Sequence, residues 1–295
     1  MKVAIVGASG ETGQSIAHAL IQQPDSFEVT ALCRPASEDK PEFQQLRNHG
    51  VKVVTLDLEA PHEELVAALV GQDTVICCII PFVPETQIAL ANAAKEAKVK
   101  RFVPSAFGPA CPPAGVLILR EIKEVFPNSK LVGDGNLRSA LTDLRDVGKY
   151  VAQVITDELT LNKSVFVYNE VLTQEEVYST LEDLSGEKIS RDYANKEEIL
   201  ANINAAQNRY DQDGSVPNLL GLSSTQYANS IWLRGDNLPE SASYLGYLNG
   251  KELYPNLKHV PFTDYVKELI TGKGKGLYVD RVFGFEKDTK MFGKQ

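Results

Sequence analysis

A short apolar stretch at the start of the chain, Lys2–Val6, runs directly into a turn that holds three glycines in seven residues. Gln14–Ile21 then continues with an apolar stripe at helical spacing. A strand, a glycine turn and a helix in this order bring free backbone N–H groups to the positive end of a helix dipole, and glycine leaves room for a pyrophosphate. The order therefore predicts a dinucleotide site at Gly7, Ser9, Gly10, Glu11, Thr12 and Gly13. The competing interpretation is an ordinary tight turn.

Strand-like and helix-like stretches alternate over the first hundred residues. The strands are expected at Phe27–Cys33, Val51–Leu56, Thr74–Ile80 and Arg101–Pro104, and the helices at Pro41–His49, His62–Val70 and Glu85–Lys98. This alternation predicts an α/β fold with a doubly wound, Rossmann-like parallel sheet. We expect residues 1–150 to form the nucleotide-binding domain and residues 151–295 a smaller substrate lobe, interleaved with it across a soft boundary.

The end of the second strand carries the residues that would select the cofactor. A site for NAD usually places Asp or Glu here, whereas this chain has Arg34, followed by Ser37 and Lys40. A guanidinium, a hydroxyl and an ammonium suit a 2′-phosphate, so NADP(H) is the expected cofactor. The alternative is a solvated surface arginine, because Glu38 and Asp39 dilute the positive charge.

Ligands of doubly wound sheets bind at the carboxyl ends of the strands. Ile79 near the end of the fourth strand, and Ser105 and Phe107 after the fifth, are therefore further candidates for cofactor contacts. Cys77 and Cys78 lie in the same region, but cysteine is commonly buried as a small apolar residue, so they are expected in the core.

Charge and composition narrow the classes of partner. Of 295 residues, 30 are Lys or Arg and 39 are Asp or Glu, and the net charge of −9 does not favour a nucleic acid or an anionic membrane. No leader-like segment or membrane-length apolar run is evident, so the expected location is cytoplasmic. The four cysteines and four histidines show no metal-ligand or disulfide spacing.

The motifs together resemble the NmrA-like and isoflavone reductase-like branch of the atypical short-chain dehydrogenase/reductases. The resemblance is carried by the glycine turn, by Arg34, and by Lys100-Arg101-Phe102-Val103-Pro104-Ser105-Ala106-Phe107-Gly108. Further along, the segments 141–148 and 165–186 are similar to that family, and 230–237 with 244–247 is similar to its fungal members. Most of the chain is covered.

The resemblance implies an NADPH-dependent reductase that acts on a small aromatic or unsaturated substrate. It further implies that Lys123, in the helix after the Ser-x-Phe-Gly segment, is the acid/base residue beside the nicotinamide. The alternative is a solvated helical lysine, since Glu121 and Glu124 flank it.

The chain departs from the family pattern after Phe126. A core strand and a loop that helps to wall the substrate pocket are missing, and Leu131–Asn136 resembles a hairpin that the family has much later. This shortening keeps a second hypothesis open, a redox sensor that binds the dinucleotide and signals to a protein partner without catalysis. A third is a shortened product without function.

One aromatic group has two interpretations. Trp232, Tyr227, Tyr244 and Tyr247 could line a pocket for an aromatic substrate or pack the C-terminal lobe, and packing is the favoured interpretation.

Overall fold

A parallel sheet organises the N-terminal half of the computed structural model, which describes residues 1–79, 84–108 and 130–273. Within these residues the sheet has five strands in the order β3-β2-β1-β4-β5. Every neighbouring pair is parallel. The strands are β1 (Lys2–Val6), β2 (Glu28–Cys33), β3 (Lys52–Thr55), β4 (Thr74–Cys77) and β5 (Arg101–Val103). The sheet confirms the predicted α/β fold.

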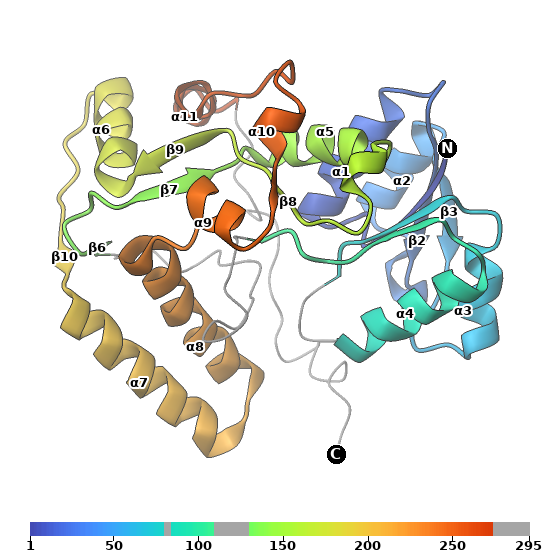
Figure 1. Cartoon of the computed structure of the whole chain (residues 1–295), viewed down its shortest axis with the longest axis horizontal. Coiled ribbons are helices and arrows are strands. Elements are labelled where there is room, and N and C mark those ends of the chain that lie inside the picture. The colour runs from blue at the N-terminus through green and yellow to red at the C-terminus, as the bar shows by residue number, and fades with distance from the viewer. Residues whose placement is uncertain (80–83, 109–129, 274–295) are drawn as a thin grey trace.

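Helices cover both faces of this sheet (Figure 1). They are α1 (Glu11–Ile21), α2 (Pro41–Asn48), α3 (His62–Leu69), α4 (Pro84–Glu96) and α5 (Leu144–Val154). Apolar side chains of α1, α2 and α5 share one buried cluster with the sheet. Those of α3 and α4 share the other. Burial on both faces explains why β1 and β4 are apolar along almost their whole length.

The element bounds agree with the sequence prediction to within a few residues. Helix α1 begins at Glu11, three residues before the expected start, with Gly10 as its N-cap. Its first turn therefore begins directly at the glycine turn. Strand β4 ends at Cys77, whereas the prediction extended it to Ile80, which lies outside the described residues.

The C-terminal half is built from short strand pairs and helices, and it occupies the other side of the molecule from the sheet (Figure 1). Its strands are β6 (Leu131–Val132), β7 (Arg138–Leu141), β8 (Val165–Phe166), β9 (Glu170–Thr173), β10 (Tyr193–Ala194) and β11 (Leu248–Asn249). Its helices are η2 (Glu158–Thr160), α6 (Gln174–Ser185), α7 (Lys196–Asp213), α8 (Val216–Asn229), η3 (Ser230–Arg234), α9 (Pro239–Tyr244), α10 (Gly250–Leu253) and α11 (Phe262–Ile270). A short η1 (Pro35–Ser37) follows β2 in the other half.

The expected hairpin around Leu131–Asn136 does not form. Strand β6 pairs in parallel with β10, and β7 pairs antiparallel with β9. The backbone N–H of Val132 donates to the Gln174 side chain at 2.9 Å, so β6 is bonded to the start of α6 rather than to β7.

Helix α5 joins the two halves, and the expected domain boundary near residue 150 falls inside it. Its buried residues Val151 and Ala152 pack with α1 against the large sheet. Its opposite side carries Asp146, a fully buried carboxylate that accepts the Asn169 side-chain amide at 2.6 Å and the Val260 backbone N–H at 2.7 Å. The Lys149 ammonium also donates to it. The boundary stays a prediction.

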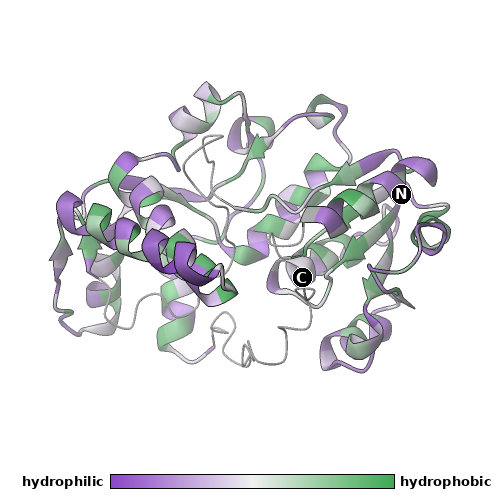
Figure 2. Cartoon of the chain, turned by 90° about the horizontal axis from the view of Figure 1, so that it is seen from below, coloured by the Kyte–Doolittle hydropathy of each residue, from purple (hydrophilic) through white to green (hydrophobic). Residues whose placement is uncertain are grey.

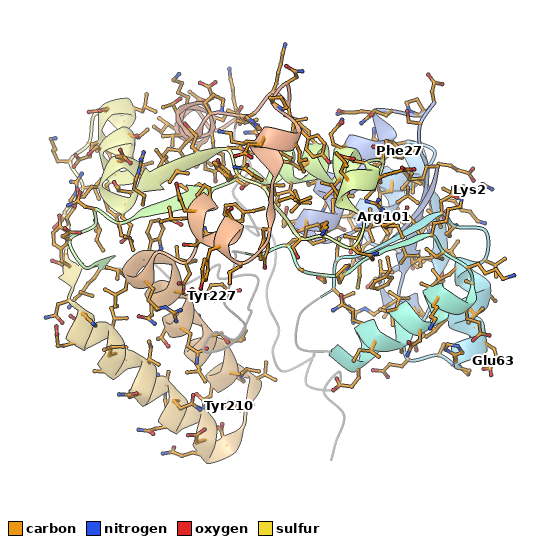
Figure 3. The ribbon with its side chains drawn as sticks, in the orientation of Figure 1. Lys2, Phe27, Glu63, Arg101, Tyr210 and Tyr227 are labelled. Carbon is orange, nitrogen blue, oxygen red and sulfur yellow. The ribbon has the colours of Figure 1, made fainter. Side chains whose placement is uncertain are left out.

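Arg101 makes a second connection between the halves (Figure 3). From the start of β5 its guanidinium donates to the backbone carbonyls of Val154 at 2.6 Å and Asp157 at 3.0 Å, and to the Thr160 hydroxyl at 2.9 Å. Carbonyls at the end of a helix lack partners within the helix, and a cation there also complements the helix dipole. Arg101 thus caps the end of α5.

Polar residues predominate on the outward faces of the helices, whereas the strands of the large sheet are mostly apolar (Figure 2). Among the helices that the structure describes, none combines the length and the apolar character that a membrane span requires. The predicted cytoplasmic location stays a prediction.

Helices α1 and α5 approach each other closely at Gly148. The Ser15 hydroxyl donates to the Leu144 carbonyl at 2.5 Å and accepts the Gly148 N–H at 3.0 Å. A Cβ atom on Gly148 would overlap the carbonyl oxygen of Ser15. Glycine inside a helix costs about 1 kcal/mol relative to alanine, so its presence here is explained by this contact.

We expect Gly148→Ala to lower the free energy of unfolding by about 1–3 kcal/mol, because the added methyl group forces two packed helices apart. Urea unfolding followed by circular dichroism measures this change. Gly221→Ala on α8 is the matched control, since nothing lies within 4 Å of a Cβ atom there. The control should be neutral or slightly stabilising. A Gly148→Ala protein as stable as the unmodified one would contradict the packing explanation.

Candidate functional site

The glycine turn lies at the carboxyl ends of the neighbouring strands β1 and β4. From β1 the chain first adds β2 and β3 on one side of the sheet and then β4 and β5 on the other. Gly7 has a φ of +80°, and a Cβ atom on it would overlap the carbonyl oxygen of Cys78. A Cβ atom on Gly13 would overlap the Gly7 carbonyl. These two glycines are therefore required by the turn itself, whatever it binds.

Gly10 differs from the other two glycines. Its φ of −73° and ψ of 160° suit any residue. Among the described residues, a Cβ atom on it would approach just the Gly7 carbonyl oxygen, at 3.2 Å. No side chain caps α1 at this position. The turn thus leaves space beside the first N–H groups of a helix, which is the arrangement that binds a phosphate.

The other turn residues lie around this space. Ser9, Glu11 and Thr12 are half-buried, and the Gln14 side chain donates to the Ser9 carbonyl at 2.9 Å. The Glu11 carboxylate is favourable in the first turn of a helix but would repel a phosphate. Its contribution to an anion site would come from its backbone N–H.

The ends of β4 and β5 are bonded to each other beside the turn. The backbone N–H of Cys78 donates to the Val6 carbonyl at 2.8 Å, and the Ser105 hydroxyl donates to the Ile79 carbonyl at 2.7 Å. The Ser105 N–H is held by the side chain of Gln87 on α4. The structure therefore brings Ile79 and Ser105 together at the predicted edge of the sheet. No sequence pattern indicated Gln87.

Phe107 and the two cysteines have packing roles. Phe107 is partly buried against the cluster that contains α1. Cys77 is fully buried and Cys78 partly buried. The expectation that the cysteine pair belongs to the core agrees with this burial.

The end of β2 presents two exposed cationic side chains. Arg34 and Lys40 are exposed, whereas Ser37 is only 6% exposed, so its hydroxyl is less accessible than the sequence prediction assumed. The charge of Glu38 is offset by Arg47, which donates to the Glu38 carboxylate at 3.4 Å and to its carbonyl at 3.1 Å. This pairing weakens the objection that nearby acids cancel the positive charge.

Lys123, the predicted acid/base residue, lies outside the described residues. Its catalytic role stays a prediction. So do the individual cofactor contacts of Gly7, Ser9, Gly10, Glu11, Thr12, Gly13, Arg34, Ser37, Lys40, Ile79, Ser105 and Phe107, although the structure gathers the turn, Ile79 and Ser105 at one edge of the sheet.

The four aromatic residues named in the sequence analysis have different surroundings in the structure. Tyr227 is buried in α8 (Figure 3), and Tyr247 packs in a small cluster with Phe166. Tyr244 is 92% exposed, so the packing interpretation does not hold for it. Trp232 packs beside Val132 and also lines a cavity.

Comparison with known proteins identifies the family. Residues 1–114 match the model of the NmrA-like family. The asnovolin J 5′,6′-dehydrogenase of Aspergillus novofumigatus is 37% identical over 316 aligned residues, which cover 92% of this chain and 96% of that enzyme. The chain belongs to the NmrA-like, isoflavone reductase-like family. This confirms the resemblance seen in the motifs.

Other members of the NmrA-like, isoflavone reductase-like family show how far the similarity reaches. The isoflavone reductase of Pisum sativum is 28% identical, with 91% of this chain and 98% of the relative covered. Among solved structures, the complex of leucoanthocyanidin reductase with NADPH from Vitis vinifera has a TM-score of 0.75 at 22% identity, covering 92% of this chain and all of that one. An isoflavone reductase structure has a TM-score of 0.70 at 24% identity, and the match covers 91% of this chain and 99% of the other chain. These structures confirm the fold.

The alignments also bear on the shortened region of this family member. The 316 aligned residues exceed the 295 residues of the chain, so the Aspergillus relative carries at least 21 residues (316 less 295) that this chain lacks. This difference is consistent with the loss of a segment, which the sequence predicts after Phe126.

Proposed function

We propose that the protein is an NADP(H)-dependent oxidoreductase that transfers hydride to a small aromatic or unsaturated substrate. The observation that carries the proposal is the space at Gly10. The backbone conformation does not demand glycine there, a Cβ atom would approach one described atom, the Gly7 carbonyl oxygen at 3.2 Å, and the position lies beside the first N–H groups of α1. A pyrophosphate fits this combination of open room and unsatisfied donors.

The relatives support the redox chemistry. The Aspergillus relative is named as a dehydrogenase and several plant relatives as isoflavone reductases. Solved structures with the same fold contain NADPH or NADP⁺. A dehydrogenase is named for oxidation and a reductase for reduction, and for this protein we propose reduction.

Each part of the site then has a role. The turn residues would hold the pyrophosphate, and Arg34 and Lys40 the 2′-phosphate. Ile79, Ser105 and Phe107 would contact the rest of the cofactor at the ends of β4 and β5. Bound NADPH would supply a hydride, and Lys123 would donate the proton that balances it.

A second candidate function is a dinucleotide-binding redox sensor that acts on a protein partner. It is favoured by the 316-residue alignment, because a chain that lacks at least 21 residues present in its relative (316 less 295) has less material to enclose a substrate. A sensor would bind the cofactor and show no turnover, and its affinity for the partner would differ between the oxidised and reduced cofactor.

Cofactor preference tests the proposal directly. We expect NADPH to bind more tightly than NADH, and Arg34→Asp to weaken NADPH binding by about 10- to 100-fold while leaving NADH nearly unchanged. Charge-assisted hydrogen bonds to a phosphate contribute about 1.5–3 kcal/mol, which corresponds to this range. Titration calorimetry with both cofactors gives the affinities.

Arg209→Asp is the matched control for this experiment. Arg209 is an exposed arginine on α7, in the other half of the molecule, and its substitution changes the net charge by the same amount. It should leave both affinities unchanged. Equal binding of NADPH and NADH by the unmodified protein would reject the cofactor assignment.

A further inference from the structure

A shallow cavity of about 340 Å³, open to solvent over much of its boundary, lies in the C-terminal half, apart from the glycine turn. It opens between the turn after β6 and the helix η3, and none of its lining residues belongs to the large sheet. In Figure 1, β6 lies on the side of the molecule opposite α1. The lining residues are Val132, Gly133, Asp134, Asn136, Leu137, Trp232 and Leu233.

The first wall of the cavity is held from behind by α6. Val132 donates its N–H to the Gln174 side chain at 2.9 Å, and Gly135 accepts the N–H of Glu175 at 3.1 Å. Gly135 has a φ of +73°, and the Glu175 side chain packs against it. These bonds hold the turn against α6.

The second wall is a π-helical turn. Ser230–Arg234 form η3, and π-helical turns are rare and often occur at functional sites. The Ser230 hydroxyl donates to the Asp236 carboxylate at 2.7 Å, and Arg234 pairs with the same carboxylate at 3.1 Å. This wall too is bonded in place, which presents Trp232 to the cavity.

The residues that line the cavity are mostly apolar, and one of them carries a charge. Trp232, Leu137 and Leu233 offer apolar surface, and Asp134 is the charged member of the lining. The Asn136 backbone N–H donates to the Asp134 carboxylate at 2.9 Å and lowers its pKa, so the carboxylate is ionised at neutral pH. Within the described part of the chain no basic side chain forms an ion pair with it.

The nearest basic residues along the sequence are engaged elsewhere. Lys130 pairs with Glu198 at 2.8 Å, and Arg138 donates to the Val171 carbonyl at 3.3 Å. Asp134 is exposed at the rim of the cavity, where the ammonium group of a ligand can pair with its carboxylate. An indole face also attracts cations more strongly than other aromatic rings do.

We propose that this cavity is a binding site for a small aromatic amine, whose ring packs against Trp232 and whose ammonium pairs with Asp134. A volume of about 340 Å³ lies within the range of small-molecule sites. The site is separate from the proposed cofactor site and does not depend on the proposed function.

Tryptophan fluorescence is the test, because Trp232 is the single tryptophan of the chain. The full-length protein is titrated with tyramine, p-cresol and 4-hydroxyphenylacetate, which share a phenol ring and carry a positive, zero and negative charge. Excitation at the red edge of tryptophan absorption avoids the probes. We expect saturable changes with tyramine binding most tightly and 4-hydroxyphenylacetate most weakly. The order should persist with NADP⁺ at saturation.

Asp134→Asn should weaken tyramine binding by about three- to tenfold and leave p-cresol unchanged, as loss of a partly exposed charge pair implies. Asp213→Asn is the matched control. Asp213 also accepts the N–H of the residue two positions later, from Ser215 at 2.8 Å, but lies before α8 and outside the cavity lining. It should leave all three affinities unchanged.

Several results would overturn the proposal. These are the absence of a saturable tyramine signal, equal affinities for the three probes, or an unaltered tyramine affinity in Asp134→Asn. Competition between tyramine and NADP⁺ would place the amine in the cofactor site and would also reject a separate cavity. Calorimetric titration of Trp232→Phe, which removes the fluorophore, should show weaker tyramine binding by a signal independent of fluorescence.

Discussion

A Gly10→Val protein is expected to lose NADPH binding by about 100-fold or more while its unfolding free energy changes by about 1 kcal/mol or less. The isopropyl group would occupy the space beside the first N–H groups of α1, where the pyrophosphate is proposed to lie. The backbone at Gly10 already has a conformation that valine adopts readily. Calorimetry with NADPH and urea unfolding of the cofactor-free protein measure the two quantities.

The contrast with other glycines makes this result specific. Gly221→Val on α8 adds the same side chain where no atom lies within 4 Å of a Cβ, and it should leave NADPH affinity unchanged. Gly7 and Gly13 are unsuitable, since a side chain on either overlaps the backbone and would disturb the fold. Near-normal NADPH affinity in Gly10→Val would mean that the turn is purely structural, and the nucleotide proposal would lose its main support.

Lys123→Ala is expected to reduce turnover of any accepted substrate by about 10²- to 10⁴-fold, the usual effect of removing a general acid. NADPH affinity should stay within a few-fold, because the proposed role concerns the substrate rather than the cofactor. The measurement is NADPH oxidation against a panel of enones, aryl ethers and quinones, combined with calorimetric titration of the cofactor.

Two variants separate proton donation from charge. Lys123→Arg keeps the cation but places it on a group that scarcely deprotonates, so it should lose turnover as well. Lys95→Ala, at an exposed position on α4, is the control for removal of a lysine charge and should keep full turnover. Undiminished turnover in Lys123→Ala would remove this residue from the mechanism. An unmodified protein without any turnover would favour the sensor.

Local sequence patterns were sufficient to predict the helices and strands of the N-terminal half of the fold. Strand β1, the glycine turn and α1 follow one another within 21 residues, so their order is readable directly. The apolar runs of β1 and β4 reflect burial on both faces of the sheet, which is a property of the sequence itself. The family could also be recognised this way, because its motifs are short and contiguous.

The C-terminal half was harder to predict, since its strands are only two to four residues long and pair with distant partners. Strand β6 pairs with β10, some 60 residues later, and Val132 is also bonded to Gln174 at the start of α6. A local pattern of Leu131–Asn136 contains no signal for either contact. The hairpin prediction failed for this reason.

A glycine turn between a buried strand and a helix could be read from the chain alone, because that signal is local. What each glycine does depends on contacts made in the folded molecule. A Cβ atom on Gly7 or Gly13 would overlap backbone atoms, one on Gly10 would come within 3.2 Å of the Gly7 carbonyl oxygen without overlap, and Gly148 meets Ser15 from 133 residues away. Glu38, which in the sequence dilutes the positive charge near Arg34, is paired with Arg47 in the folded molecule. Charge and space around a residue depend on neighbours that the chain brings together in three dimensions, and spacing along the sequence does not record them.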